Sequence, residues 1–412
     1  MRKVAITGVG TINPIAGNKE EFREALEKMR VGIDLITQFD TSDQKVKIAG
    51  EVKNFNPADY MDKKSARRYD RFLQLAIAAS REALEDSGLL DSEDWKKSAA
   101  VIIGSGIGGF KTLFNEFNKF NKNGPKTVSP FLIPMMIPDM ASGIVSIHYN
   151  IKGPNLATVS ACASSLHAVA ISALMIRHGY IDIAITGGSE AVIDPMPIAA
   201  FANMRALSTR NDEPLKASRP FDKNRDGFVM AEGAGILILE AEELAKKRGA
   251  KIYGYIEGFG MTGDAYHISA TEPTGEGGAK AIEAALKDAG VDVDDIDLIN
   301  CHATSTPVGD RSEVLAIRKV FKDKSEKPYI QSTKALIGHA LGAAGAIELI
   351  GLLLEFEGNF VHGMPNLEDP DEDFKGLKLL TETLDFKSKI ALKNSFGFGG
   401  HNISIVVKKG GE

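Results

Sequence analysis

Cys162 is the first residue in the chain whose setting suggests chemistry. It follows an apolar run at 157–160 that reads as a strand, and it precedes an alanine-rich run that reads as a helix. A thiol at the start of a helix faces free backbone amides and the positive end of the helix dipole, which favour the thiolate and lower the pKa of the cysteine. Cysteine is also a common buried residue. Taken alone, Cys162 is therefore either a nucleophile or a packing residue.

Two histidines occur in segments that could complete such a site. His302 ends a strand-like run and is followed by hydroxyl and turn residues. His339 follows Gly338 near the expected start of a helix, where its pKa should be lowered and its imidazole neutral. The segment 394–402 is rich in glycine, which frees backbone amides to point at a ligand. A lone histidine is more often structural, but a cysteine and two histidines in turn-forming segments are harder to explain by structure alone.

The elements that would hold these residues are typical of a layered α/β protein, because strand-like apolar runs alternate with amphipathic helices. We expect strands at 4–7, 99–103, 157–160, 183–186, 236–239, 298–300 and 403–407, and a helix over 72–87 that ends at Gly88. Residues 159–165 and 330–335 both turn from a strand into an alanine-rich helix, which is a faint sign of duplication.

Two segments carry more local predictions. Asp226-Gly227 is a hairpin signal, with strands expected at 228–229 and 236–237. The stretch 109–140 is polar at first and then rich in proline and methionine, and we expect it to form a cap.

Length and composition limit the function classes. The 412 residues exceed the usual size of one domain, so two domains packed as one unit are expected. The net charge of -6 argues against a general nucleic-acid binder. Two cysteines, Cys162 and Cys301, fit a reducing cytosol better than a secreted disulfide scaffold. No apolar run suits a signal peptide or a membrane span, so a cytoplasmic protein without membrane partners is expected.

The segments around Cys162, His302, His339 and 394–402 resemble those of the β-ketoacyl-[acyl-carrier-protein] synthases, within the thiolase-like condensing enzymes. The resemblance runs nearly end to end. It also covers residues 7–10, 206–210, 219–222, 226–229 and 397–400. The chain is more similar to the synthase II branch than to synthase I, and the second histidine argues against synthase III, which uses Cys-His-Asn.

The resemblance implies a duplicated thiolase-like fold with α-β-α-β-α layers and mixed five-stranded sheets. The half 1–250 would hold the nucleophile and the cap insertions, and the half 251–412 would hold both catalytic histidines. It further implies a homodimer, an acyl-carrier protein and malonyl-acyl-carrier protein as partners, and neither an organic cofactor nor a metal.

The implied reaction lengthens a fatty acid by two carbons. The thiolate of Cys162 takes the acyl chain from its carrier, and the backbone amides of Cys162 and Phe398 stabilise the tetrahedral oxyanion. His302 and His339 donate hydrogen bonds to the thioester oxygen of malonyl-carrier protein while decarboxylation creates an enolate. The resulting carbanion then attacks the acyl group on Cys162.

Further roles come from the same resemblance. Lys334 and Glu348 would form a buried pair that supports the histidines, or a purely structural one. Asp310 would order the loop around His302. Phe398 would act as a gate that admits the acyl chain or the malonyl group, or it would only pack in the core. Substrate contacts are expected from Ile107, Phe201, Thr304, Thr306 and Phe396, which could otherwise be ordinary core and turn residues. The carrier protein would dock on Lys64, Arg67, Arg68, Lys126 and Arg205, where charge would speed association or simply be solvated.

The sequence departs from the family pattern at 335–337, at 301–303 and at Lys126, which leaves chain-length preference and carrier affinity open. Residues 104–109 satisfy GxGxxG, so a nicotinamide-dependent oxidoreductase is an alternative, although no clear second strand with a ribose-binding acid follows. The sequence gives little support for a zinc site, because its two cysteines lack Cys-x-x-Cys spacing. A non-catalytic chain-length factor would lack the cysteine, whereas a polyketide-type ketosynthase with the same chemistry stays open.

Overall fold

The computed structural model describes residues 1–411, and in this part of the chain eleven strands form the main sheet. Its strands are β1 (Val4–Ile12), β4 (Ala100–Gly104), β5 (Asn155–Leu156), β6 (Ile183–Glu190), β7 (Gly233–Ala241), β8 (Gly254–Gly263), β9 (Leu298–Asn300), β10 (Tyr329–Gln331), β12 (Lys378–Leu379), β14 (Ile390–Gly397) and β15 (His401–Lys409). Two small pairs join β2 (Asp34–Leu35) to β3 (Ile48–Ala49) and β11 (Phe360–Val361) to β13 (Leu384–Asp385).

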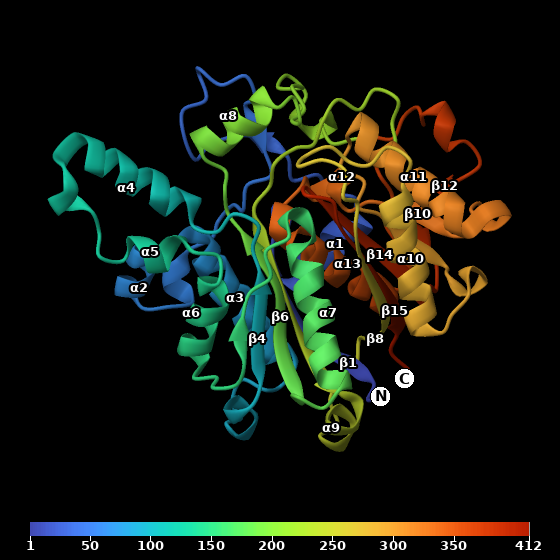
Figure 1. The fold of residues 1–412 in the computed structure, drawn as a ribbon, viewed down its shortest axis with the longest axis horizontal. Coiled ribbons are helices and arrows are strands. Elements are labelled where there is room, and N and C mark those ends of the chain that lie inside the picture. Colours follow the sequence, from blue (N-terminus) through green and yellow to red (C-terminus); the bar gives the residue numbers. More distant parts are fainter. Residues whose placement is uncertain (412) are drawn as a thin grey trace.

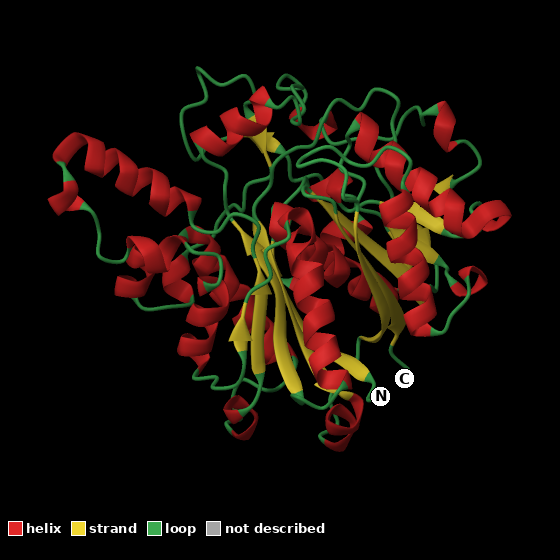
Figure 2. Ribbon diagram, in the orientation of Figure 1, coloured by secondary structure: helices red, strands yellow, loops and turns green. Residues whose placement is uncertain are grey.

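The helices are α1 (Lys19–Glu27), α2 (Lys63–Arg68), α3 (Arg71–Asp86), α4 (Phe110–Asn123), α5 (Leu132–Met136), α6 (Met140–Tyr149), α7 (Ser164–Arg177), α8 (Pro195–Asn203), α9 (Glu242–Lys247), α10 (Glu276–Ala289), α11 (Pro307–Phe321), α12 (Lys334–Ile337) and α13 (Ala344–Gly358). Two short 3₁₀ turns matter for the site, η4 (Ala161–Ala163) and η8 (Leu341–Ala343). Figures 1 and 2 show how these elements are arranged.

The main sheet contains the same five-stranded arrangement twice. One half runs β1-β7-β6-β4-β5 and the other runs β8-β15-β14-β9-β10, with β12 added at the end. In each half the first two neighbouring pairs are antiparallel and the last two are parallel. The halves join where β1 pairs antiparallel with β8. This repeat confirms the expected duplicated α/β fold, whereas the division of the chain at residue 250 stays a prediction.

Helices cover both faces of each half and produce five layers. Helices α7 and α13 pack on each other in the middle, and α13 contacts both β7 and β14. Helices α3 and α6 pack on the outer face of the first half, while α10 packs on β8 and β15 of the second half and on α11. Figure 1 shows α7 and α13 between the two groups of strands. Burial of apolar side chains on both sides of each half drives this layering.

Glycines allow the outer helices to approach the strands equally closely in the two halves. A Cβ at Gly10 of β1 would lie 2.1 Å from the carbonyl oxygen of Ala79 in α3, and one at Gly260 of β8 would lie 2.1 Å from that of Ala281 in α10. Only glycine fits where backbone meets backbone at this distance. The matching positions extend the duplication from strand order to packing detail.

The turns that lead into α7 and α13 are also matched. Ala161 in η4 has φ 50° and Leu341 in η8 has φ 46°, a left-handed conformation that costs a non-glycine residue about 1 kcal/mol. The counterpart of Cys162 and its helix is therefore η8 with α13. The sequence analysis matched residues 159–165 to residues 330–335. This match was wrong, because residues 334–337 form only the short helix α12.

Two local predictions were wrong. Residues 157–160 form no strand, because β5 ends at Leu156. Asp226-Gly227 makes no hairpin, since Phe228 bridges Leu207 and Met230 bridges His339, and both bridges join distant segments. The cap expected at 109–140 stays a prediction; α4 and α5 project to one side beside α2 and line a surface cleft with it (Figure 1). No helix within residues 1–411 is long and apolar enough to cross a membrane.

Candidate active site

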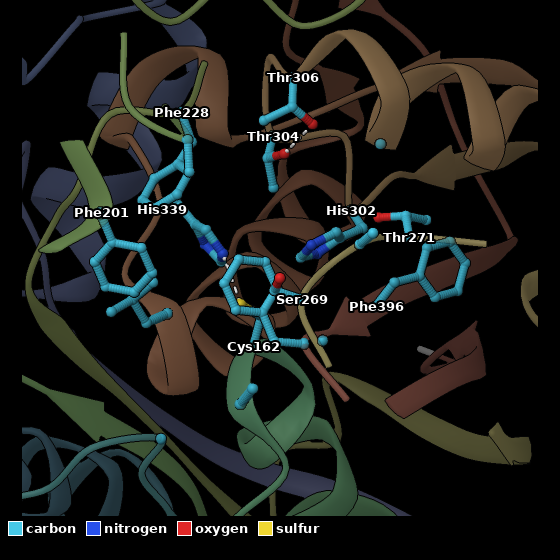
Figure 3. A pocket seen from close by; sticks show the side chains of 18 of the residues that line it. Cys162, Phe201, Phe228, Ser269, Thr271, His302, Thr304, Thr306, His339 and Phe396 are labelled. Carbon is cyan, nitrogen blue, oxygen red and sulfur yellow. Dashed lines mark hydrogen bonds between the residues drawn. The ribbon is translucent and has the colours of Figure 1, made fainter. Parts of the chain in front are cut away.

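A cavity of about 220 Å³ lies where the two halves meet, and residues from both halves line it. Cys162 comes from η4 before α7, His302 follows β9, and His339 lies between α12 and η8. Figure 3 shows these three side chains pointing into the same space between aromatic and threonine side chains. The duplicated fold therefore brings together the three residues that the sequence singled out.

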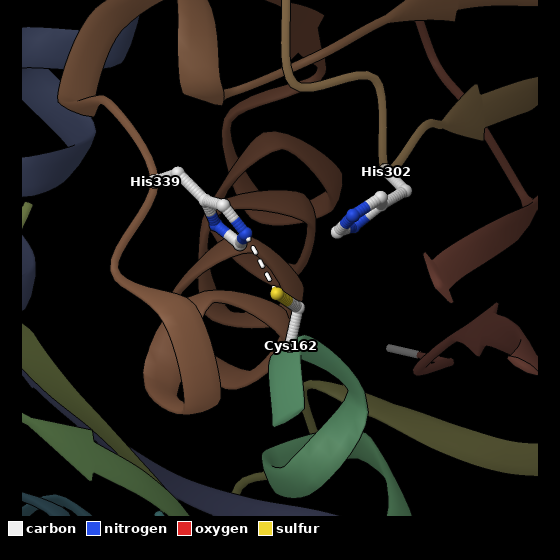
Figure 4. Close-up of side chains that lie close together, drawn as sticks. All are labelled: Cys162, His302 and His339. Atoms are coloured by element: carbon white, nitrogen blue, oxygen red, sulfur yellow. Dashed lines mark hydrogen bonds between the residues drawn. The ribbon is translucent and has the colours of Figure 1, made fainter. Parts of the chain in front are cut away.

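Cys162 and His339 are in direct contact. The Nε2 of His339 lies 3.0 Å from the Sγ of Cys162 (Figure 4). The ring of His302 meets that of His339 edge to face, with centroids 5.3 Å apart. One imidazole can thus exchange a proton with the sulfur, and the second faces the same cavity.

The turn before α7 fixes the sulfur. The backbone N–H of Ser160 donates to the Oγ of Ser164 at 2.9 Å, and that hydroxyl donates to the carbonyl of Ala161 at 2.7 Å. These bonds hold Ala161 in its left-handed conformation. Backbone strain of this kind persists only where the surroundings enforce it, and it occurs often at functional sites.

The pKa of Cys162 differs from the sequence expectation. Burial raises the pKa of the thiol to about 12, while the charge of Lys334 and the backbone amides of Phe398 and Cys162 act in the opposite direction. The helix start therefore does not produce a resting thiolate, because desolvation of the anion is the larger effect. The resting thiol is protonated and can donate to the Nε2 of a neutral His339.

Two backbone amides face the sulfur, those of Cys162 and Phe398. They are adjacent because Gly397 packs against the nucleophile turn: a Cβ on Gly397 would lie 2.7 Å from the carbonyl oxygen of Ser160 and 3.1 Å from the nitrogen of Cys162. A pair of amide donors beside a nucleophile is the arrangement that stabilises a tetrahedral oxyanion.

His339 is held by its backbone. Its N–H donates to Val229 at 2.7 Å and its carbonyl accepts from Ala231 at 2.9 Å. Gly338 before it has φ 74°, which favours glycine. The pKa of His339 lies well below its usual range because of burial first and then the charges of Lys334 and Lys393. The neutral imidazole was predicted, but its cause is burial and two lysines rather than a helix start.

His302 is held by a residue that the sequence analysis missed. Buried Glu313 of α11 accepts from the backbone N–H of His302 at 2.9 Å and from that of Ala303 at 2.7 Å. The pKa of His302 is also well below its usual range, through burial and then the charges of Lys334 and its neighbours. Both imidazoles are therefore neutral.

Three buried charges lie behind the histidines. The Nζ of Lys334 is 2.5 Å from one oxygen of Glu348, and the Nζ of Lys393 is 2.6 Å from the other. The Lys334–Glu348 pair was expected from the resemblance. Lys393 was missed, because a lysine in a strand-like run gives no sign that it points into the core.

Two family models match most of the chain. The model described as "Beta-ketoacyl synthase, N-terminal domain" matches residues 1–245, and the one described as "Beta-ketoacyl synthase, C-terminal domain" matches residues 253–368. The chain belongs to the β-ketoacyl synthase family. It is a condensing enzyme with a thiolase-like fold, of the acyltransferase class.

Individual relatives support the same family assignment. The chain is 44% identical to the 3-oxoacyl-[acyl-carrier-protein] synthase 2 of Synechocystis and 47% identical to that of Staphylococcus aureus, in each case over 99% of this chain and 98% of the relative. Among solved structures it is similar to a type II polyketide ketosynthase bound to a hexaketide and in complex with its acyl-carrier protein, with a TM-score of 0.92, 31% identity and full coverage of both chains.

Aromatic side chains of the synthase surround Cys162 and the two histidines. Phe201 lies 6.2 Å from Phe398 and 5.4 Å from Phe228, and Phe228 packs edge to face on His339 at 5.4 Å. Phe228 was missed as a pocket residue because 226–229 was interpreted as a hairpin. Ile107, Phe201, Phe396 and Phe398 all line the cavity.

The pocket also has a polar side. Thr304 and Thr306 line it, with their hydroxyl oxygens 3.0 Å apart. Asp310 accepts from the amides of Ser305 and Thr306 at 3.1 and 3.3 Å, so it ties down the loop that follows His302. Burial raises the pKa of Asp310 to about 6. These positions are consistent with the roles predicted for the three residues, which stay predictions.

The glycine-rich turn at 104–109 holds a carboxylate of the protein itself. Buried Glu190, at the end of β6, accepts from the amides of Gly106 at 2.7 Å, Ile107 at 3.1 Å and Gly342 at 3.0 Å. The amides that would bind a dinucleotide phosphate are therefore occupied. This contact argues against an oxidoreductase, and it links η8 to the turn that carries Ile107.

The basic residues expected to dock a carrier protein are all exposed. Arg67 and Arg68 of α2 line a surface cleft with Lys111 and Lys119 of α4, which the sequence analysis did not name. The guanidinium of Arg68 lies 3.9 Å from the ring centre of Phe131. Within residues 1–411, Lys64, Lys126 and Arg205 do not line this cleft. The predicted docking set is thus only partly gathered in one place.

Cys162, His302 and His339 bear ligand types that bind soft metals. The ligand atoms of Cys162, His302 and His339 lie within 4.8 Å of one another. Cysteine spacing could not reveal this, because it ignores residues that only the fold brings together. The Nε2 of His339 and the Sγ of Cys162 are directed at each other. We therefore interpret the cluster as a nucleophile with its hydrogen-bonding partners.

Proposed function

We propose that this protein is a 3-oxoacyl-[acyl-carrier-protein] synthase of type 2, which lengthens fatty acids by decarboxylative condensation with malonyl-acyl-carrier protein. The observation that carries the proposal is the 3.0 Å contact between Cys162 and His339 in a cavity shared with His302. The named relatives, which this chain matches over 99% of its length, support the choice of substrates.

The first half-reaction transfers the acyl chain to the enzyme. The Sγ of Cys162 attacks the carrier thioester while its proton passes to the Nε2 of neutral His339. The amides of Cys162 and Phe398 stabilise the oxyanion. As the tetrahedral intermediate collapses, the carrier thiolate leaves and takes the proton, so the enzyme keeps a thioester and a neutral imidazole.

The second half-reaction forms the carbon–carbon bond. Once Cys162 is acylated, the ring proton of His339 moves from Nδ1 to Nε2 by exchange with water, so neutral His302 and His339 both donate from Nε2–H to the thioester oxygen of the malonyl group. Loss of carbon dioxide leaves its electron pair as an enolate whose negative oxygen these donors stabilise. The enolate carbon attacks the acyl carbonyl, the enolate oxygen becomes the thioester carbonyl of the product, and the bond to sulfur breaks. The thiolate of Cys162 then takes a proton from water. Both steps use only protein groups and the two substrates, so we propose no metal and no organic cofactor.

The acyl-carrier protein would dock at the cleft between α2 and α4. Arg67, Arg68, Lys111 and Lys119 give this cleft a basic lining, which suits an acidic partner. Lys64, Lys126 and Arg205 would extend the basic surface around it. Complementary charge mainly raises the association rate and is screened by salt.

We propose a homodimer formed at the free edge of the sheet. β5 is the last strand beside β4, so its other edge can pair with a second chain. Leu156 of β5, Val159 and Ile147 of α6 are exposed apolar side chains in the same part of the chain. A cytoplasmic location is proposed because Cys162 and Cys301 are both free thiols.

A polyketide-type ketosynthase is the second candidate, supported by the 31% identical structure of that class. A panel of acyl-carrier-protein substrates of increasing chain length, incubated with malonyl-carrier protein, tests the choice. Saturated long-chain acyl groups that are extended once to 3-oxoacyl products support the proposal. Acceptance of only polyketone chains, with repeated extension, would favour the second candidate.

A further inference from the structure

Lys393 is one of two fully buried lysines that share a single carboxylate. Lys334 is 1% exposed, and Lys393 and Glu348 are fully buried. The carboxylate of Glu348 lies between the two ammonium groups, 2.5 Å from Lys334 and 2.6 Å from Lys393. With all three groups ionised, the cluster has one positive charge in excess.

A buried charge without a counter-charge is costly. Burial lowers the pKa of Lys393, whereas the carboxylates of Glu348 and Glu313 act in the opposite direction. Lys393 is therefore paired in the core, and its positive charge adds to that of Lys334 behind the two histidines.

Lys393 is connected to the catalytic histidines in two ways. Lys393 contacts Glu348, which also holds Lys334. The charge of Lys334 lowers the pKa of both histidines. Its Nζ also donates to the carbonyl of Asn394 at 2.8 Å, and the Nδ2 of Asn394 donates to Glu313 at 3.0 Å. The same oxygen of Glu313 accepts from the backbone of His302.

The strand register brings Lys393 close to the site. In β14 it pairs with Asn300 of β9, two residues before His302. The same strand continues to Phe396 and Gly397, which line the cavity. Lys393 thus lies directly behind the catalytic pocket.

We propose that Lys393 is a positioning residue of the condensing reaction: it holds Glu348 in place against Lys334 and adds a second positive charge that keeps His302 and His339 neutral while negative charge develops on the substrate. The inference rests on the proposed function. Neutral imidazoles with Nε2–H are the donors that decarboxylation requires, and a nearby positive charge favours both the neutral imidazole and the enolate.

Several charged or titratable groups surround the two histidines, which also face each other. They are Cys162 from η4, Glu313 from α11, Lys334 from α12, Glu348 from α13 and Lys393 from β14, and Glu190 from β6 acts on Cys162. Of these groups, Lys334 and Lys393 carry positive charge, and the carboxylates of Glu313 and Glu348 act on them. Replacing Lys393 therefore removes one of the two positive charges that act on the histidines.

The test compares wild type, Lys393→Met and the control Lys409→Met, which removes a half-buried lysine from the far end of β15. Carbon dioxide release from malonyl-carrier protein is measured between pH 5.5 and 9, with kcat and KM determined separately. We expect Lys393→Met to lower kcat about tenfold, to leave KM within about twofold, and to move the acidic limb up by about one pH unit. The melting temperature should stay equal or rise, because the remaining pair is balanced.

A Lys393→Met variant with the wild-type rate and the wild-type acidic limb overturns the inference, as does a loss of activity that only follows a loss of folded protein. If Lys393→Met does not fold, Lys393→Gln and Lys393→Arg carry the test: the first must move the limb and the second must not. NMR titration of the imidazoles separates this inference from the proposed function. If the wild-type enzyme releases no carbon dioxide, the proposed function is contradicted. The role of Lys393 is still decided by comparing the imidazole pKa values of the Lys393 variants with those of wild type.

Discussion

The Nε2 of His339 lies 3.0 Å from the Sγ of Cys162, whereas His302 meets His339 edge to face, with ring centres 5.3 Å apart. The two imidazoles are therefore not equivalent. His339 can accept the proton of a thiol whose pKa burial raises to about 12, and both histidines can donate to the malonyl thioester. This asymmetry gives the first prediction.

Replacing each histidine separately should divide the two half-reactions. We expect His302→Ala to acylate Cys162 at close to the wild-type rate, and His339→Ala to acylate it more slowly at neutral pH but to completion. Decarboxylation should fall by about a hundredfold or more in both, since each loses a donor to the developing oxyanion. Rapid-quench mass spectrometry and carbon dioxide release measure the two steps. Equal acylation rates in the two variants would refute the proton transfer to His339.

Gly397 should tolerate no side chain. In Gly397→Ala the new Cβ would lie 2.7 Å from the carbonyl of Ser160, so the turn that holds Cys162 must shift and the two amides must separate. We expect kcat/KM for the acyl substrate to fall about a hundredfold, with a far smaller change in the melting temperature. Gly263→Ala is the control, because the nearest atom to its Cβ is 4.0 Å away. A fully active Gly397→Ala would disprove the oxyanion role of these amides.

Glu355 of α13 should make stability depend on pH. Burial raises its pKa to about 8, and it accepts from the backbone of His362 at 2.8 Å. The unfolded chain ionises this carboxyl near its usual pKa of 4.5 and the folded chain only near 8, so the folded state loses stability as pH rises between these values. Glu355→Gln removes this loss. Its free energy of unfolding should exceed that of wild type by about 4 kcal/mol at pH 8 and lie within about 0.5 kcal/mol of it at pH 4.5.

Denaturant unfolding at the two pH values measures the effect of Glu355→Gln. A difference from wild type that is the same at pH 4.5 and pH 8 would show that Glu355 is ionised in the folded protein.

Charge reversal should reveal the carrier-protein surface. Arg67→Glu with Arg68→Glu should raise KM for acyl-carrier protein about tenfold at low salt, with a smaller effect at high salt. A short acyl thioester without the carrier should react as with wild type. The control is Lys247→Glu, an exposed residue of α9, which lies away from α2 (Figure 1). An equal loss with both substrates, or an equal effect of the control, would place docking elsewhere.

The members of the site could be predicted from the sequence because their types and flanking turns are local features. Cys162, His302 and His339 each lie in a short segment that ends one element and starts another. The fold could be predicted through resemblance, since the motifs run along the whole chain. The matched glycines at Gly10 and Gly260 show how local composition encodes close helix packing.

The supporting groups could not be predicted, because tertiary contacts define them. Glu190, Glu313 and Lys393 look like ordinary charged residues until the fold buries them beside distant partners. The same limit explains the wrong cause assigned to the cysteine pKa, since burial outweighs the local effect of the helix start. It also explains the false hairpin, where Met230 bridges His339, more than a hundred residues away in the chain.

The central claim is that Cys162 stores the acyl chain and releases it to a carbanion formed in the same pocket. Intact mass spectrometry of the enzyme incubated with acyl-carrier protein, and then with malonyl-carrier protein, tests it most directly. The account predicts one acyl group on Cys162, its loss on the second addition, and an equal amount of a 3-oxoacyl product two carbons longer, with none of these events in Cys162→Ala. Full condensing activity in Cys162→Ala, or an acyl group on another residue that is carried into product, would contradict it.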